Sequence, residues 1–147
     1  KIMKKLILSK DLELDREKQY ILKDFCKYCI SFLKIESPVK IYVVNDRQSH
    51  GIKTTAYYDR SDKIIKVYGK NRALVDICRS ICHELVHCSQ DEKGLLVGVI
   101  QDAGGEIEDE ANARAGEVIK RFAKSNDHRK AIYESMILES AARRSIF

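Results

Sequence analysis

Residues Asn71 to Gly94 read NRALVDICRSICHELVHCSQDEKG, and this stretch decides how the rest of the chain is interpreted. At about 100° per residue its apolar and polar side chains separate onto two arcs, as in an amphipathic helix. Asn71 is a residue type favoured as an N-cap and Gly94 is a stop signal, so we predict a helix from Asn71 to about Lys93. The apolar arc holds Leu74, Val75, Ile77, Cys78, Ile81, Cys82, Leu85, Val86 and Cys88, and the polar arc holds Asp76, Arg79, Ser80, His83, Glu84, His87, Gln90 and Asp91.

The polar arc contains His83-Glu84-Leu85-Val86-His87. Two imidazoles four residues apart on a helix lie one above the other, so they can converge on one metal ion. Glu84 falls beside that ion, where its carboxylate can take a proton from a water molecule. We therefore predict His83 and His87 as zinc ligands and Glu84 as a general base. The alternative is an ordinary amphipathic helix with two surface histidines.

A third ligand is expected further along the chain, because catalytic zinc takes three protein ligands and leaves one position for water. On a predicted helix over Glu106–Lys124, Glu108 and Asn112 lie along the edge of the apolar face, whereas the other glutamates point to the far side. Since an unpaired buried carboxylate is costly, we predict that Glu108 coordinates the ion. We expect Asn112 to accept an N–H from a ligand imidazole. The side chains downstream that could supply this third ligand are Glu106, Glu108, Glu110, Glu117 and His128.

The other segments predict an α+β domain with helices packed on a small sheet. Apolar residues recur at helical spacing from Asp15 to Ile35, and Pro38 disfavours a longer helix. Two strand-like runs joined by the turn-rich segment 59–62 predict an antiparallel hairpin. We therefore expect one helix, a three-stranded and mostly antiparallel sheet, the helix described above and two further helices. The strands are predicted at Lys40–Val44, Thr54–Tyr58 and Lys63–Tyr68, and the last two helices at Glu106–Lys124 and Asp127–Arg143.

Length and composition fit one soluble domain over residues 1–147, with 33% charged and 44% hydrophobic residues. The net charge of +5 is mild, so a nucleic-acid partner is not expected. The apolar runs Leu6–Leu8 and Leu95–Ile100 are too short for a signal peptide or a membrane span, so we expect a cytoplasmic protein without membrane association. Five cysteines fit free thiols in a reducing compartment. Cys26 and Cys29 fall on the apolar face of the first helix, which favours core packing over a redox pair or a zinc ribbon.

The motif His83-Glu84-Leu85-Val86-His87, followed by Glu108-Asp109-Glu110-Ala111-Asn112, resembles the gluzincin signature H-E-x-x-H then E-x-x-A/S-D/N. The short form of that zincin fold occurs in ImmA/IrrE-type regulatory peptidases and in small phage- and prophage-borne metallopeptidases. The resemblance covers roughly Lys40 to Lys124. It implies His83, His87 and Glu108 as metal ligands, Glu84 as base and Asn112 as the partner of a ligand imidazole. It also implies that a strand of the hairpin, Lys63–Tyr68, lines the cleft and pairs with an extended substrate.

Together these features predict a metallopeptidase with one catalytic Zn²⁺ that hydrolyses a peptide bond in a protein or peptide. Glu84 would take a proton from the attacking water and deliver it to the leaving amine. A metal-binding regulatory or interaction domain without catalysis is the alternative. A zinc hydrolase of a formyl amide is disfavoured, because the glycine-rich and cysteine motifs of deformylases are missing. The group that stabilises the oxyanion is left open among Tyr57, Tyr58, His50, His128 and Tyr133.

Overall fold

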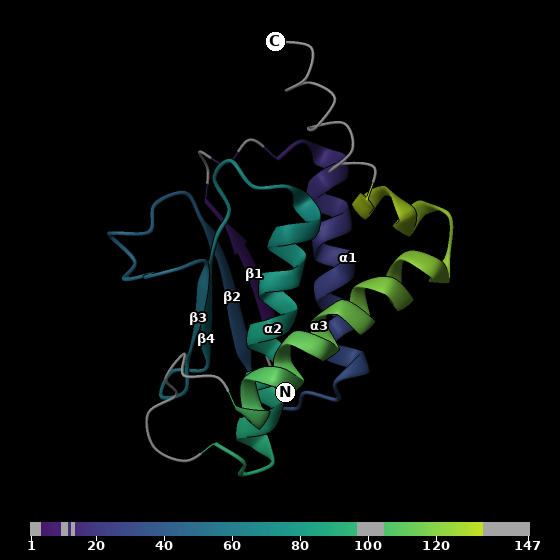
Figure 1. The fold of residues 1–147 in the computed structure, drawn as a ribbon. Coiled ribbons are helices and arrows are strands. Elements are labelled where there is room, and N and C mark those ends of the chain that lie inside the picture. Colours follow the sequence, from purple (N-terminus) through teal and green to yellow (C-terminus); the bar gives the residue numbers. More distant parts are fainter. Residues whose placement is uncertain (1–3, 10–11, 13, 97–104, 134–147) are drawn as a thin grey trace.

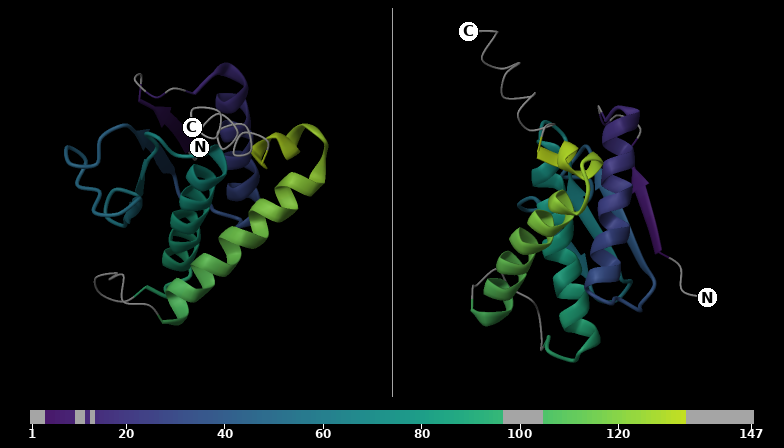
Figure 2. Two further views of the ribbon diagram at one scale, coloured as in Figure 1. Left: turned by 45° about the horizontal axis from the view of Figure 1, so that its top comes forward. Right: turned by 90° about the vertical axis from the view of Figure 1, so that its right-hand side faces the viewer.

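A four-stranded sheet with helices packed against it forms the protein in the computed structural model (Figure 1). The structure describes residues 4–9, 12, 14–96 and 105–133. Helices α1 and α2 lie against the sheet, and α3 packs across α2 and reaches α1 (Figure 2). The predicted α+β class is confirmed. In chain order the elements are β1 (Lys4–Leu8), α1 (Arg16–Phe32), β2 (Val39–Val44), β3 (Ala56–Asp59), β4 (Ile64–Tyr68), α2 (Leu74–Glu92), α3 (Glu106–Ser125) and the short 3₁₀ helix η1 (His128–Lys130).

The strand order is β1-β2-β4-β3, and three of the strands run parallel. Leu6 of β1 lies opposite Ile41 of β2, and Ile41 lies opposite Ile65 of β4. The expectation of a three-stranded, mostly antiparallel sheet was therefore wrong. It missed β1, which is five residues long and begins with two lysines. It also overlooked α1 as a crossover helix, the usual connection between two parallel neighbours.

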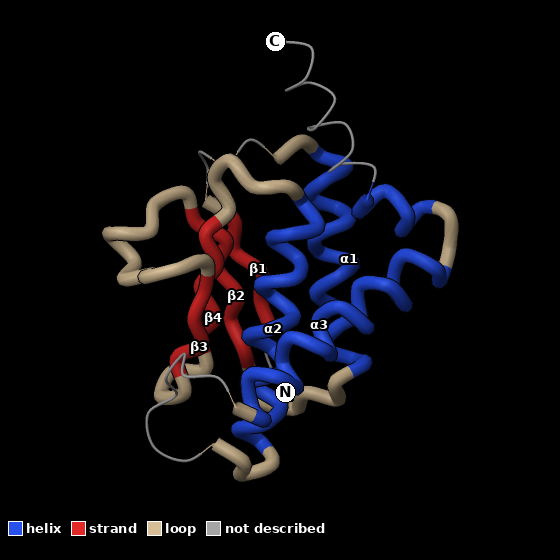
Figure 3. The backbone as a smooth tube through the Cα atoms, in the orientation of Figure 1, coloured by secondary structure: helices blue, strands red, loops and turns tan. Residues whose placement is uncertain are grey.

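The predicted antiparallel hairpin is confirmed, with Tyr58 of β3 opposite Ile65 of β4. Its turn is held by the Asp59 carboxylate, which accepts a hydrogen bond from the Ser61 backbone N–H at 2.9 Å. Lys63 closes the turn in the left-handed region, at φ 55°. The turn lies at one end of the sheet and the loop over residues 45–55 at the other (Figure 3).

The long helices begin and end close to where the sequence predicted. Asp15 caps α1 by accepting a hydrogen bond from the Lys18 backbone N–H at 2.8 Å. Asn71 was expected to cap α2, and this was wrong: the N-cap is Ala73, and Asn71 takes φ 59° in the preceding turn. Asn populates this left-handed conformation more readily than most residues, which makes it a turn residue here. Gly94, at φ 73°, follows the end of α2 as predicted.

The last predicted helix, Asp127–Arg143, lies largely outside the described residues. Within them it begins as η1 and continues as helical backbone to Tyr133. The apolar run Leu95–Ile100 also falls mostly outside them. No helix among the described residues is both long and apolar enough to cross a membrane.

The core lies between the sheet and the helices and includes all five cysteines, each free and buried. Cys29 of α1 and Cys82 of α2 place their sulfur atoms 3.1 Å apart. The expected core position of Cys26 and Cys29 is therefore confirmed. Phe25 of α1 meets Phe122 of α3 edge-to-face, with ring centroids 5.2 Å apart. These contacts hold both α2 and α3 against α1, and the polar residues described below lie between α2 and α3.

Candidate metal centre

His83 and His87 project from the same side of α2, one turn apart. Their Nε2 atoms lie 3.2 Å apart, and their rings meet edge-to-face. The intervening Leu85 and Val86 are buried in the core. A rotation of the helix that moved the histidines away would therefore expose Leu85 and Val86 to solvent. The predicted convergence of the two imidazoles is thus a consequence of the amphipathic pattern of α2.

Glu108, in the first turn of α3, meets both histidines. Its Oε1 atom lies 3.0 Å from His83 Nε2 and its Oε2 atom lies 2.7 Å from His87 Nε2. Glu106 and Glu117 of the same helix are exposed, as predicted for the far side. The structure therefore brings Glu108, the acid that the helical pattern singled out, together with both histidines.

The two oxygens of Glu108 differ: Oε1 meets hydrogen-bond geometry with His83 Nε2, whereas Oε2 does not meet it with His87. Glu108 Oε2 is buried and has no hydrogen-bond partner among the described residues, although His87 Nε2 lies 2.7 Å away. That contact has the distance of a hydrogen bond without its geometry, as expected when lone pairs point at a common centre. Ligand atoms about 2.0–2.1 Å from a tetrahedral ion stand roughly 3.3 Å from one another, close to the spacings seen here. His83, His87 and Glu108 could accordingly hold a metal ion.

Gln90, one turn after His87 on α2, orients that histidine. Its Oε1 atom lies 2.8 Å from His87 Nδ1, and its side-chain amide donates to the Ile107 carbonyl at 3.1 Å and to Glu110 Oε1 at 2.7 Å. Because the amide nitrogen donates to these two partners, the atom that faces His87 Nδ1 is the amide oxygen. An amide oxygen only accepts, so the Nδ1 proton of His87 points at Gln90. The lone pair of Nε2 is then left facing the centre.

Gln90 was not assigned a role from the sequence, although its position three residues after His87 on the polar arc was a usable signal. Asn112 was given the corresponding role. In the structure Asn112 is exposed and lines the pocket beside Glu108. The amide contact to a ligand imidazole that the structure contains comes from Gln90.

Glu84 lies in the same pocket as the candidate ligands. Its side chain is 11% exposed, and Oε2 lies 4.0 Å from His83 Nε2. A carboxylate at this distance is close enough to reach a small molecule bound at the centre without itself replacing one of the three ligands. This is the placement expected of a general base.

The pocket has a volume of about 360 Å³ and opens between α2, the start of α3 and the chain entering β3. Arg72 closes one end by donating to the Tyr68 carbonyl at 2.7 Å and to Ser80 Oγ at 2.9 Å. Apart from Ala56, the rest of the lining is polar and includes Thr54, Thr55, Asp76 and Arg79 together with His83, Glu84, Glu108 and Asn112.

The sheet edge beside this pocket is β3. The expectation that Lys63–Tyr68 lines the cleft and pairs with substrate was wrong, because β4 is an inner strand with β2 on one side and β3 on the other. Its backbone hydrogen-bonding groups are already used in the sheet. β3 pairs with β4 on one side and, among the described residues, has no strand on the other.

None of the five candidate oxyanion groups lines the pocket among the described residues. Tyr57 donates to the His50 carbonyl at 3.0 Å, and Tyr58 donates to Asp91 Oδ2 at 2.7 Å. Burial and the hydrogen bond to Asp91 raise the pKa of Tyr58 well above its usual value. His128 packs edge-to-face on Tyr20, with ring centroids 5.1 Å apart.

Comparison of the chain with protein-family models, with curated proteins and with solved structures found no significant match.

Proposed function

We propose that the protein is a zinc-dependent metallopeptidase. The convergence of two imidazoles and one carboxylate, with Glu84 in the same pocket, carries this proposal. Two nitrogen ligands and one oxygen ligand form a set that catalytic zinc commonly uses, and three protein ligands leave one position open. The polar stripe of α2, the N-terminal turn of α3 and the buried, unpartnered Glu108 Oε2 all support the same centre.

Each polar residue then has a distinct task. A bound zinc ion supplies Lewis acidity, which lowers the pKa of a water molecule and polarises the substrate carbonyl. Glu84 accepts a proton from the attacking water and returns it to the nitrogen of the leaving amine. Gln90 holds His87 in the tautomer that leaves Nε2 available.

A polypeptide substrate suits the pocket and its surroundings. The pocket is open to solvent and lies next to the edge of β3 that no described strand covers, where backbone groups can pair with an extended chain. Arg72, Ser80 and the two threonines at its wall are polar groups that can bind substrate carbonyls.

The test separates catalysis from metal binding. Glu84→Gln should retain one zinc per chain and lose at least about 10²-fold in peptidase rate, the contribution typical of a general base. Glu108→Ala should lose zinc, whereas Glu106→Ala, an exposed acid of the same helix turn, should retain it. Zinc content is measured by elemental analysis, and turnover by mass spectrometry of a peptide library and of denatured proteins.

Either of two results would overturn the assignment. If Glu108→Ala keeps a full zinc complement, the ligand set is wrong. If the zinc-loaded wild type and Glu84→Gln behave alike on every substrate tested, the domain binds metal without catalysis.

A further inference from the structure

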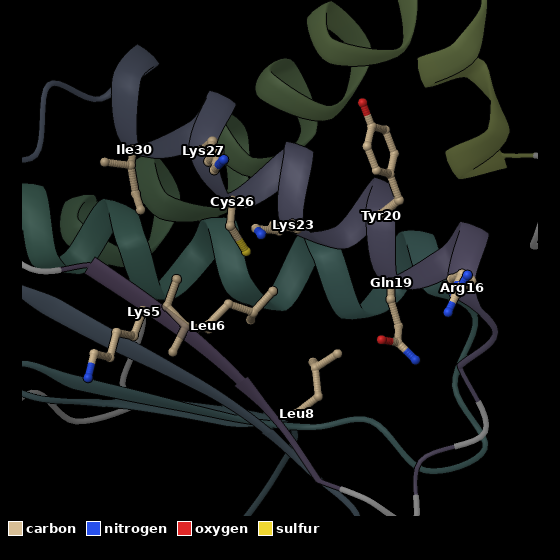
Figure 4. Close-up of a pocket in the computed structure, with 11 residues that line it drawn as sticks. Lys5, Leu6, Leu8, Arg16, Gln19, Tyr20, Lys23, Cys26, Lys27 and Ile30 are labelled. Carbon is tan, nitrogen blue, oxygen red and sulfur yellow. The ribbon is translucent and has the colours of Figure 1, made fainter.

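A second hollow lies at the opposite edge of the sheet, between α1 and β1 (Figure 4). Its volume is about 330 Å³, and its floor is apolar, built from Leu6 and Leu8 of β1, Cys26 and Ile30 of α1, and Ile41 of β2. Leu6 and Leu8 rise from the strand towards the helix, and Cys26 points back towards the strand (Figure 4). Leu6, Leu8 and Ile30 are only half-buried, so the groove exposes apolar surface.

Positive charge surrounds this apolar floor. Among the described residues, no acidic side chain lines the groove, and four cationic ones do: Lys5, Arg16, Lys23 and Lys27. None of the four has an ion-pair partner within the part of the chain that the structure describes. The groove is therefore complementary in charge to an acidic ligand.

The strand beside the groove also has a free edge. β1 pairs with β2 on one side and has no other strand neighbour among the described residues. An exposed edge presents unpaired N–H and C=O groups that can add a further strand. Ile7, on the other face of β1, is 37% exposed. It would gain a cross-strand neighbour if a strand were added to β1.

The spacing of the charges decides between a small ligand and a peptide. Arg16 and Lys27 are eleven residues apart on α1, which places them about 16 Å apart along the helix axis. A single anionic head group, as in a fatty acid, can reach only one end of such a row. The groove also continues past Ile30 into a second hollow, which shares Lys27 and Ile30 with it and is lined further by one cationic and one acidic side chain, Lys34 and Glu36. An elongated ligand with several negative charges matches both features.

We propose that the groove between α1 and β1 binds an acidic, extended peptide segment of a partner protein, which adds to β1 as a fifth strand. From Arg16 to Ile30 the groove follows α1 for about 21 Å, the length of roughly six residues of extended chain. Alternate side chains of the bound segment face the groove, where apolar residues cover Leu6, Leu8 and Ile30. Its acidic groups lie against the cations along α1. The site is separate from the metal centre and does not depend on its proposed function.

The experiment uses the full chain and a displayed library of random decapeptides. Selection should enrich sequences in which apolar residues alternate with Asp or Glu. The enriched peptide is then synthesised, and its affinity is measured by fluorescence polarisation, with zinc and after chelation. Methylating its backbone nitrogens one at a time should weaken binding at every second residue, because only alternate N–H groups face β1.

A charge-reversal pair with a matched control tests the cationic row. Lys23→Glu with Lys27→Glu should lower the affinity at least about tenfold, as expected when two pairs of opposite charges become pairs of like charges. Lys120→Glu with Lys124→Glu changes the net charge equally, on two exposed lysines also four residues apart on a helix, and should leave the affinity unchanged.

Several outcomes would overturn the proposal. These are a selection that enriches no acidic sequence, equal binding by both double variants, or a methylation scan without alternation. Competition for the groove at similar concentration by phosphatidylglycerol vesicles or by oligo(dT) would assign it instead to a membrane surface or to a nucleic acid.

Discussion

At the scale of single residues, the geometry of the candidate metal centre depends on a neighbouring amide as well as on its three candidate ligands. Gln90 is 2% exposed and uses both ends of its side chain, accepting from His87 and donating to α3. Gln90 therefore sets the tautomer of His87 and also links α2 to α3. The same centre contains Asn112, the amide implied by the resemblance, on its exposed side.

The two amides can be distinguished by substitution. Gln90→Leu should weaken zinc binding about 10- to 100-fold, because loss of the group that orients a ligand imidazole typically has that effect. Asn112→Ala should leave zinc affinity close to that of wild type. Affinity is measured by competition with a chromophoric chelator, and circular dichroism checks that both variants fold. A larger loss for Asn112→Ala than for Gln90→Leu would assign the role to Asn112.

The cysteines make a second prediction at this scale. Burial raises the pKa of Cys26 to about 12 and that of Cys88 to about 11. At pH 8 a thiol with the former value is ionised to only about one part in 10⁴, so it is a poor nucleophile. Iodoacetamide should therefore label almost no cysteine in the folded protein at pH 8 and all five in urea, as counted by mass spectrometry. Rapid labelling of Cys26 or Cys29 in the folded protein would instead indicate an accessible thiol pair.

At the scale of elements, the long helices and the hairpin were predictable, whereas β1 and the parallel pairing of the sheet were not. The patterns of α1, α2 and α3 repeat over 17 to 20 residues each, so their periodicity identified both their extent and the faces that carry His83 and Glu108. β1 reads KKLIL, two lysines followed by three apolar residues, and so lacks the alternation that identifies a half-buried strand. Parallel pairing of β2 with β1 and β4 joins segments distant in sequence, and no local pattern encodes it. For the same reason β4 was expected at the edge of the sheet beside the candidate metal centre, where the structure has β3.

The link between the hairpin and α2 depends on one carboxylate. Asp91, near the end of α2, accepts hydrogen bonds from Tyr58 at 2.7 Å and Lys63 at 2.6 Å, and Arg60 lies 3.3 Å away. Burial acts to raise the pKa of the Asp91 carboxyl, but Lys63, Tyr58 and Arg60 together outweigh it and hold that pKa below its usual value. The carboxylate is 12% exposed, so these bonds are shielded from solvent.

Asp91→Asn should lower the free energy of unfolding by about 2 kcal/mol, the scale of hydrogen bonds to a charged group. Because the pKa of Asp91 is lower in the folded than in the unfolded chain, its contribution is present above about pH 4 and disappears as the pH falls below that value. The variant should therefore lose less stability than wild type between pH 5 and pH 3, as measured by urea unfolding. Asp76→Asn, which removes an exposed ion pair with Arg79, should change stability by no more than about 1 kcal/mol. Equal effects of the two substitutions would contradict the role of Asp91.

At the scale of the whole molecule, the two edges of the sheet differ in chemistry. The β3 edge borders a polar pocket with three candidate metal ligands, and the β1 edge borders an apolar groove lined by cations. Between them lies one continuous core that includes buried side chains of both α2 and α3. The candidate metal centre joins the polar stripe of α2 to the first turn of α3, whereas the core joins the two helices along their apolar faces. This division determines what metal removal should do.

The core already holds α2 against α3, so the metal-free protein should remain folded and unfold cooperatively. Zinc at 100 times its dissociation constant should raise the free energy of unfolding by about 2.7 kcal/mol, because it binds the folded chain and not the separated ligands of the unfolded one. Urea unfolding with zinc and with a chelator measures this difference. Glu108→Ala should show no zinc-dependent gain, and Glu106→Ala should show the full gain. A metal-free chain without cooperative unfolding would mean that the ion, and not the packing of the shared core, holds α2 against α3.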